Sequence, residues 1–442
     1  MCKRFKIIRA GLLGITLFLP IAMLAQNAKV HEFPTAKPEA LGFSEAKLKK
    51  MQQDMQRYVD ERKLAGIVTL VARQGKVVHA EKYGMQEIEN ERPIQLNTIF
   101  RMASMTKPLT SVAVMMLYEQ GRLKLDDPVS KFIPAFAETK VYATAGKLAQ
   151  LDRPITIKDL LMHTSGITAS AFGNSPVHVM YREADLGSAP TLDDFVSRLA
   201  SLPLLHQPGG SWSYGLSTDV LARVVEVVSG IPFDRFLVRQ VIEPLKMYDT
   251  DFMVPKEKRG RFAALYKTEN TDGLKLVEAP TASEFVKPPK FPRGNTGIVS
   301  TALDYFRFAQ MLLNGGELDD ARLLKRESVA LMTRNHLPEN LIPLRVGPAE
   351  FTNNGFGLGF SVVVNQKTVA AINSNGFWWN RGTPPVGSYW WVGAYQTYFW
   401  IDPQNEIVGV FMAQSTDVMK YPFMQEFHTL VYEAFGNGQL ND

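Results

Sequence analysis

The sequence TIFRMASMTKPLTSVAVMMLYEQ, residues 98 to 120, predicts the helix around which the fold is built. Leu109 and Val112 belong to an apolar stripe at helical spacing along it. Ser104 and Lys107 lie three residues apart in its first turn, so both side chains emerge on one face. A serine at a helix N-terminus beside a desolvated lysine is a candidate nucleophile, because the neutral amine can accept its proton.

The S-x-x-K spacing alone leaves another interpretation open. Ser44 and Lys47 have the same spacing, and there the pattern predicts a helix N-cap followed by a solvated charge. Ser104 could in the same way be a cap beside an exposed lysine. Companion motifs elsewhere in the chain are needed to decide between the two interpretations.

The composition is that of a soluble globular protein, since 45% of the 442 residues are hydrophobic and 21% are charged. A chain of this length exceeds what one hydrophobic core usually carries. We therefore expect two lobes.

The first 25 residues have the pattern of a secretory signal: a basic start, an apolar run and a small residue, Ala25, at the expected cut. The basic residues are Lys3, Arg4, Lys6 and Arg9. A retained N-terminal anchor is the alternative. We expect an exported protein, periplasmic or secreted, with no membrane association once the signal is removed.

Removal of the signal changes the charge and the cysteine content. The formal net charge of +5 falls to +1, so the basic balance belongs to the precursor and does not support a nucleic-acid partner. Cys2 is the single cysteine and leaves with the signal, which excludes a disulfide, a thiol nucleophile and a cysteine metal ligand in the mature protein. The sequence leaves the oligomeric state open.

Predicted strands lie near both ends of the chain, at residues 66–84 (two strands around a turn), 356–364, 389–401 and 407–413. Predicted helices cover residues 44–62, 156–163, 191–201, 217–229, 303–313 and 422–435. The stretch 267–292 is rich in Pro, Thr, Glu and Lys and predicts a loop.

This order of segments predicts an α+β fold, with an antiparallel sheet built from both ends of the chain and flanked by N- and C-terminal helices. A mainly helical lobe is inserted between the two halves of the sheet. We place the sheet domain at residues 39–130 and 290–442 and the helical domain at residues 131–289. A cleft between the lobes is the expected site.

Two further motifs carry candidate site residues. In HQPGGSWSYGL, residues 206–216, a Pro-Gly-Gly turn delivers Trp212 and Tyr214 just before a helix. Tyr214 is either a packed core tyrosine or a phenol that passes protons beside Ser104. In WVGA, residues 391–394, the glycine marks either a close approach of another backbone or a bulge.

Together these segments resemble the serine hydrolases of the class C β-lactamase and penicillin-binding esterase family. The matching blocks are SMTK (104–107), LLMHTSGI (160–167), PGGSWSYGL (208–216), GIVSTALDYFRFAQMLLNGG (297–316) and WVGAYQTYFWIDPQN (391–405). The resemblance runs over nearly the whole mature length. The resemblance implies a β-lactamase/transpeptidase-like fold and favours Ser104 as the nucleophile.

The resemblance also implies an acyl-enzyme mechanism without metal or cofactor. Ser104 would attack a carbonyl, while Lys107 and Tyr214 would take its proton and later activate water. The backbone N–H groups of Ser104 and Ala394 would hold the oxyanion. Which of Lys107 and Tyr214 is the base stays open, since such coupled groups titrate as a unit.

Two departures from the family pattern concern the substrate. The second motif usually reads Tyr-x-Asn, but Leu216 stands in the place of the asparagine and removes a donor to a substrate amide. The third motif usually opens with Lys or His, whereas here it opens with Trp391, which resembles the esterase branch. Arg293 or Arg381 could restore the missing positive charge.

Tryptophans gather at the second and third motifs. Trp212 lies in the second, and around the third lie Trp378, Trp379, Trp390, Trp391 and Trp400. We expect about half of them to pack the sheet. The others, with Leu216 and Gly393, would shape an aromatic, uncharged pocket that suits neutral esters.

We therefore predict a secreted serine hydrolase, a carboxylesterase whose partner is a small-molecule ester or amide substrate. A β-lactamase or D-alanyl peptide hydrolase is the alternative reaction, and a non-catalytic binding or sensor protein on the same fold is the alternative class. The sequence contains no G-x-S-x-G elbow and no H-E-x-x-H zinc motif. His163 is expected to hydrogen-bond locally within the helical lobe rather than to pair with a serine.

Overall fold

A computed structural model describes residues 33–143, 146–269, 273–347, 349–365, 384–418 and 420–436. The predicted signal, residues 1–25, lies outside these ranges. The described residues belong to one compact unit, Phe33–Asp442. Within them, no helix is both long and apolar enough to span a bilayer.

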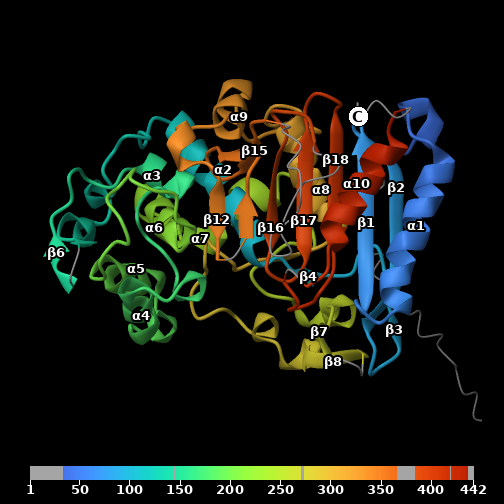
Figure 1. The fold of residues 1–442 in the computed structure, drawn as a ribbon, viewed down its shortest axis with the longest axis horizontal. Helices are drawn as coiled ribbons and strands as arrows, with labels where there is room; N and C mark the ends of the chain where they lie inside the picture. The colour runs from blue at the N-terminus through green and yellow to red at the C-terminus, as the bar shows by residue number, and fades with distance from the viewer. Residues whose placement is uncertain are drawn as a thin grey trace, which may run out of the picture. The chain divides into compact units, whose positions relative to one another are not determined.

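An antiparallel sheet of eight strands organises this unit (Figure 1). In spatial order the strands are β14 (Asn354–Phe356), β15 (Ser361–Val363), β16 (Tyr389–Gly393), β17 (Thr397–Asp402), β18 (Ile407–Met412), β1 (Gly66–Arg73), β2 (Lys76–Glu87) and β3 (Arg92–Pro93). Both ends of the chain contribute, because β1 pairs with β18 and places Val68 opposite Met412. This confirms the predicted α+β fold with a sheet built from both ends.

Helices cover both faces of the sheet. Every residue of β17 and β18 is buried, which means that side chains on both faces of these strands are covered. The flanking helices are α1 (Glu45–Asp60), α8 (Ala302–Leu313) and α10 (Phe423–Ala434). α8 packs against β1, β17 and β18, while α1 and α10 pack against each other. Ser44 is the N-cap of α1, as predicted, and its hydroxyl accepts from the Lys47 N–H at 3.4 Å.

The predicted nucleophile helix is α2 (Thr106–Glu119). It packs against α6 and α7, and the 3-10 turn η2 (Ala103–Met105) that leads into it packs against β16 and β17. Every residue from 106 to 117 is buried, so the helix is enclosed on all sides and not only along the predicted stripe. α2 thereby joins the sheet to the other helices (Figure 1).

The remaining helices are α3 (Ile157–Met162), α4 (Pro176–Glu183), α5 (Leu192–Ala200), α6 (Ser217–Ser229), α7 (Phe233–Leu237) and α9 (Arg326–Thr333). α6 packs against α3, α5 and α7, and it ends at Gly230 in a left-handed conformation with φ 75°. α3 to α7 all fall within residues 131–289. The division into a sheet domain and a helical domain stays a prediction.

Five short pairs complete the strands: β4 (Phe100–Arg101) with β9 (Val299–Ser300), β5 (Val141–Tyr142) with β6 (Leu148–Ala149), β7 (Leu265–Glu269) with β8 (Gly273–Glu278), β10 (Glu317–Leu318) with β11 (Ala321–Arg322), and β12 (Leu344–Val346) with β13 (Ala349–Phe351). The β7–β8 pair falls largely inside the stretch 267–292, where the prediction of a loop was therefore wrong in part. Its Pro- and Lys-rich surroundings conceal the short alternating run LKLVE that forms β8.

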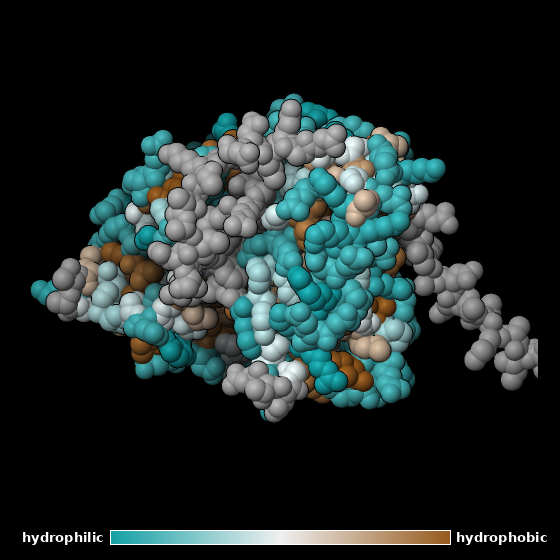
Figure 2. Space-filling view, turned by 45° about the vertical axis from the view of Figure 1, so that its right-hand side comes forward, coloured by the Kyte–Doolittle hydropathy of each residue, from teal (hydrophilic) through white to brown (hydrophobic). Residues whose placement is uncertain are grey.

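The described surface carries few large apolar side chains. On the face shown in Figure 2, hydrophilic residues dominate and hydrophobic ones occur in separate small patches. The buried apolar residues of the described ranges instead form one large cluster, which includes side chains of β1, α2, α6 and β17, and a second, small cluster that includes Phe262. The candidate site lies within this well-packed frame.

Candidate active site

Ser104 lies in the η2 turn, directly before α2. The preceding Ala103 has φ 46°, a left-handed conformation that costs energy for a residue other than glycine. The Thr106 hydroxyl donates to the Ala103 carbonyl at 2.7 Å and holds this turn. Ser104 is half-buried while its neighbours Ala103 and Met105 are buried, so the turn presents the serine at the positive end of the helix.

The fourth sequence block supports this turn from behind. β4, just before the turn, pairs with β9, and the Met102 N–H donates to the Ile298 carbonyl at 3.1 Å. The Ile298 N–H in turn donates to the Thr106 hydroxyl at 3.3 Å. Residues almost 200 positions apart therefore fix the strained turn that carries Ser104.

The Lys107 amine lies beside the serine. Its Nζ is 3.0 Å from Ser104 Oγ, and the side chain is only 3% exposed. Burial holds the Lys107 pKa well below the ordinary value of 10.5, with Asp219 opposing this shift and Arg293 adding to it. This shift favours the neutral amine, which is the form that can accept a proton.

Tyr214 closes the third side of this group. Lys107 Nζ lies 4.5 Å from the centroid of its ring, and Ser104 is one of the groups that act on the pKa of its phenol. Burial raises the pKa of the phenol, which favours its neutral form. The Trp391 indole N–H also donates to the Tyr214 oxygen at 3.4 Å. The structure therefore brings together the three side chains predicted from distant motifs.

Asn295, which belongs to none of the sequence motifs, is a further acceptor of Lys107. Lys107 Nζ donates to the backbone carbonyl of Asn295 at 3.2 Å and also to its side-chain Oδ1. The Asn295 N–H donates to Asp219 Oδ1 at 3.1 Å. Asp219 is fully buried in α6, but in the sequence it is an acidic residue in the first turn of a helix, a position that gives no signal of this network.

Arg293 does not supply the free positive charge considered from the sequence. Its Nη2 lies 2.5 Å from Asp219 Oδ2, and its Nε donates to Asp219 Oδ1 at 3.3 Å. The charge of the guanidinium is thus offset by a buried carboxylate. Arg381 lies outside the described residues.

Aromatic rings surround Tyr214. Its ring centroid is 5.2 Å from that of Trp391 and 6.1 Å from that of Trp212, which it stacks. The ring centroid of Phe356 lies 5.4 Å from the ring centroid of each of these two tryptophans. Trp212 and Trp391 are nevertheless mostly buried, so they shape the wall of the site largely through their packing on Tyr214.

Two of the other tryptophans pack the sheet, as expected for about half of the six. Trp390 and Trp400 are fully buried in the sheet. A Cβ added to Gly409 would lie 2.0 Å from the Trp400 ring, which explains the glycine at that position of β18. Trp378 and Trp379 lie outside the described residues.

Gly393 at the end of β16 marks a close backbone approach. A Cβ there would lie 2.3 Å from the Met102 carbonyl oxygen and 2.2 Å from Thr397 Oγ1. The β16–β17 register continues through Gly393 opposite Thr397 without a bulge, which decides between the two interpretations of this glycine. Ala394, the next residue, is exposed.

Leu216 is the N-cap residue of α6, two positions after Tyr214. Its side chain is half-buried against the core, and its backbone N–H donates to the Thr168 carbonyl at 3.3 Å. An apolar side chain therefore occupies the position where the family pattern places an amide.

His163 packs on the site in a way that the sequence did not indicate. Its ring centroid is 5.0 Å from that of Tyr214 and 6.0 Å from that of Trp212. Its Nδ1 is buried and has no hydrogen-bond partner among the residues that the structure describes, so the predicted local hydrogen bonding is not found at this atom. Burial, with a smaller effect of Lys107, holds the His163 pKa well below 6.5. The neutral imidazole thus serves as an apolar face behind the phenol.

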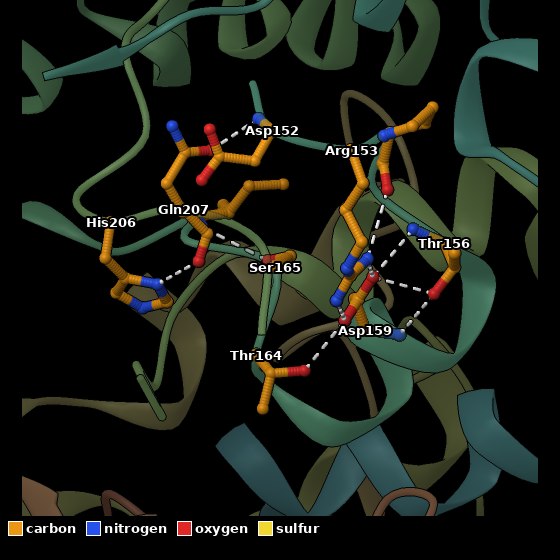
Figure 3. A network of polar contacts seen from close by, with 10 residues as sticks. Asp152, Arg153, Thr156, Asp159, Thr164, Ser165, His206 and Gln207 are labelled. Carbon is orange, nitrogen blue, oxygen red and sulfur yellow. Dashed lines mark hydrogen bonds and ion pairs between the residues drawn. The ribbon is translucent and has the colours of Figure 1, made fainter. Parts of the chain in front are cut away.

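Asp159 stabilises the loop that carries His163 (Figure 3). Its carboxylate accepts from both Arg153 Nη atoms at 2.6 and 2.8 Å, and from the Thr164 hydroxyl at 3.1 Å. The backbone N–H and hydroxyl of Thr156 donate to it at 2.9 and 2.7 Å, completing the capping box of α3. In the part of the chain that the structure describes, no group of three His, Cys, Asp or Glu residues could hold a metal.

Comparisons with known proteins agree with this geometry. A family model described as Beta-lactamase matches residues 51–430. Protein Rv1367c of Mycobacterium tuberculosis is 33% identical over 369 residues, which cover 82% of this chain and 89% of that protein. Esterase EstB of Burkholderia gladioli is 30% identical over 372 residues, which cover 77% of this chain and 84% of the esterase. The solved structure of EstCE1, described as a hydrolase with promiscuous acyltransferase activity, has a TM-score of 0.73 at 26% identity and covers 88% of this chain and 98% of its own.

Proposed function

The chain belongs to the beta-lactamase family of serine hydrolases and acyltransferases, and from this premise we propose that it is a carboxylesterase for neutral esters that works through an acyl-enzyme. The observation that carries the proposal is the contact of a buried Lys107 amine with the Ser104 hydroxyl, 3.0 Å apart, beneath the ring of Tyr214. A nucleophile with its base already in hydrogen-bond reach is the arrangement that acyl transfer requires.

In the proposed first step, Ser104 Oγ bonds to the ester carbonyl carbon and its proton passes to Lys107. The N–H groups of Ser104 and Ala394 donate to the resulting oxyanion. The tetrahedral intermediate then breaks its bond to the alcohol, and the leaving oxygen takes a proton from the neutral phenol of Tyr214, which Lys107 reprotonates. Water repeats the sequence on the acyl-enzyme and releases the acid.

The neutral lining supports an uncharged substrate. Trp391 stands where a cation would serve a carboxylate, Leu216 replaces the amide of the second motif, and Arg293 is paired with Asp219. Trp212 and Gly393 complete the proposed wall. An anionic β-lactam would find little positive potential here to complement its carboxylate, whereas a neutral ester needs none.

Purified protein tested against p-nitrophenyl butyrate, nitrocefin and a D-Ala-D-Ala peptide separates the reactions. We expect turnover of the ester. Turnover restricted to nitrocefin or to the peptide would instead support the β-lactamase or D-alanyl peptide hydrolase alternative.

A fluorophosphonate probe tests the non-catalytic alternative. We expect covalent labelling of Ser104, detected by mass spectrometry of the peptide that contains it. A folded protein that remains unlabelled would support a binding or sensor role on the same fold.

We also propose that the protein is exported and acts in the periplasm or outside the cell, on the basis of the basic and apolar pattern of residues 1–25. Fractionation of cells that express the full chain tests this, together with the N-terminal sequence of the product. Protein retained with the membrane and with Met1 in place would favour the uncleaved anchor.

A further inference from the structure

We propose that Asn295 is a positioning residue that aims the lone pair of the Lys107 amine at the Ser104 hydroxyl. The inference rests on the proposed function, since it assigns the direction of the first proton transfer. It adds a residue that lies outside the three motifs and that reaches Lys107 through its backbone and its side chain together.

One nitrogen, the amine of Lys107, has several partners. Among the residues that the structure describes, Lys107 Nζ has three hydrogen-bond partners: Ser104 Oγ, the Asn295 carbonyl oxygen and Asn295 Oδ1. The nitrogen is tetrahedral, so beyond its bond to Cε it has three directions, which equals the number of these partners.

Two of these partners can only accept. The backbone carbonyl and Oδ1 of Asn295 carry lone pairs and no hydrogen, so each requires an N–H from Lys107. A neutral amine has two N–H bonds and one lone pair. Both N–H bonds are therefore directed to Asn295, and the lone pair is left facing Ser104, whose hydroxyl can donate. After the transfer, the third N–H of the ammonium points along the same direction and can return the proton.

Asn295 is itself held in place. Its backbone N–H donates to Asp219 Oδ1 at 3.1 Å, and Asp219 is fixed by Arg293. The adjoining Gly294 carbonyl accepts from the Thr110 hydroxyl of α2 at 2.8 Å. The two acceptors of Asn295, which we call the clamp, are thus connected to α6 and α2. Lys107 therefore cannot rotate its amine away from Ser104 without losing both acceptors.

Other groups around the amine set its charge state. The charged groups are Asp219 of α6 and Arg293, which act on Lys107 in opposite directions, and the titratable groups are Tyr214 and the His163 ring. These stay in place when Asn295 is changed. Because Oδ1 stabilises an ammonium better than an amine, its loss lowers the Lys107 pKa, whereas a carboxylate at the same position raises it.

The test compares Asn295→Ala with Asn295→Asp. Alanine keeps the backbone acceptor and removes only Oδ1, and aspartate is nearly isosteric with asparagine but charged. We expect alanine to lower the pH-independent kcat/KM for p-nitrophenyl butyrate by about ten- to a hundredfold and to move its acid limb to lower pH. We expect aspartate to move the acid limb upward by about one pH unit or more. Asn314→Ala, at the C-cap of α8, is the matched control and should leave the profile unchanged.

If Asn295 only supported the fold, both substitutions would lower the activity or the melting temperature. They would not move the acid limb of the pH profile in opposite directions. Unchanged acid limbs in both folded variants would overturn the inference while leaving the esterase proposal intact. If the alanine variant fails to fold, aspartate against wild type decides. If the wild type neither turns over esters nor reacts with the fluorophosphonate, the proposed function fails, but an NMR titration of 13Cε-labelled Lys107 still tests the clamp: equal lysine pKa values in wild type and both variants would refute it.

Discussion

The backbone N–H of Ser213 donates a 2.8 Å hydrogen bond to the carbonyl oxygen of His163. Ser213 directly precedes Tyr214, so the position of the phenol is tied to the residue that ends α3. A second bond, from the Gly209 N–H to the Thr164 carbonyl at 2.8 Å, holds the start of the same segment. Thr164 also donates its hydroxyl to Asp159 in the polar network of Figure 3, so this network supports the segment that leads to Tyr214.

Asp159→Asn should destabilise the protein and lower its activity. The buried carboxylate loses its ion pair with Arg153, and we expect a fall of about 1–3 kcal/mol in the free energy of unfolding, measured in urea. We also expect kcat/KM to drop several-fold, because Thr164 and the segment before Tyr214 lose their support. Asp193→Asn, which breaks an ion pair of an aspartate that is 60% exposed, is the control and should change stability by less than about 1 kcal/mol.

The pH dependence of this difference follows from the Asp159 pKa. Burial alone raises it, but the hydrogen bonds from Arg153 and Thr156 outweigh burial and hold it below 3.8. A carboxylate whose pKa falls on folding stabilises the native state above its unfolded pKa and loses this effect as the pH falls through the folded value. The gap between wild type and Asp159→Asn should therefore narrow below about pH 4. A gap that stays constant to pH 3 would contradict this assignment.

Alanine substitution of the two S-x-x-K serines should have opposite effects on activity and on stability. Ser104→Ala should abolish ester turnover and fluorophosphonate labelling while changing the free energy of unfolding by less than about 0.5 kcal/mol. Ser44→Ala should leave turnover unchanged and cost about 0.5–2 kcal/mol, because Ser44 caps α1. A large loss of thermal stability in Ser104→Ala would indicate a structural role for that serine.

The sequence predicted those parts of the site that lie within short motifs. Ser104 and Lys107 share one helical turn, and Tyr214 follows a Pro-Gly-Gly turn, so local spacing was sufficient to propose them. Their meeting at one point depends on packing among α2, α3 and α6, which spacing does not determine. The helix predicted at residues 217–229 was confirmed because its apolar periodicity and its Gly230 stop agree.

Asn295 and Asp219 could not be predicted in this way, because their role depends on a contact between segments 76 residues apart. In the sequence, Asp219 has the place of an ordinary acidic residue in the first turn of a helix, and Arg293 has that of a free surface cation. Only the fold shows that Asp219 and Arg293 form an ion pair close to Lys107. The β7–β8 strands were missed for a related reason, since their pairing partner and not their composition defines them.

Leu216→Asn should move the protein toward β-lactam chemistry. The new amide would sit at the N-cap of α6, where a donor to a substrate carbonyl is otherwise missing, and asparagine is a favourable N-cap residue. One hydrogen bond worth about 1.4 kcal/mol in the transition state corresponds to a tenfold change in rate. We expect the ratio of nitrocefin to p-nitrophenyl butyrate kcat/KM to rise by about that factor. Leu216→Met is the apolar control, and an equal rise in that variant would refute the role of the amide.

Lys107→Met should abolish turnover and reveal how strongly burial lowers the Lys107 pKa. Between that lowered pKa and 10.5, the unfolded chain binds a proton at Lys107 that the folded protein does not. Above pH 10.5, Lys107 therefore does not reduce the free energy of unfolding of the wild type. As the pH falls from 10.5 toward the lowered pKa, that free energy decreases by up to about 1.4 kcal/mol per pH unit. The methionine variant lacks this proton, so it should become more stable relative to the wild type as the pH falls from 10 to 7.

Urea unfolding of the wild type and of Lys107→Met across this range measures the difference. Lys49→Met, which changes an exposed lysine of α1, is the control for the substitution itself. A difference between wild type and Lys107→Met that does not vary with pH would show that the amine is protonated in the folded protein, and Lys107 would then be unable to act as the base that the acyl-enzyme mechanism requires.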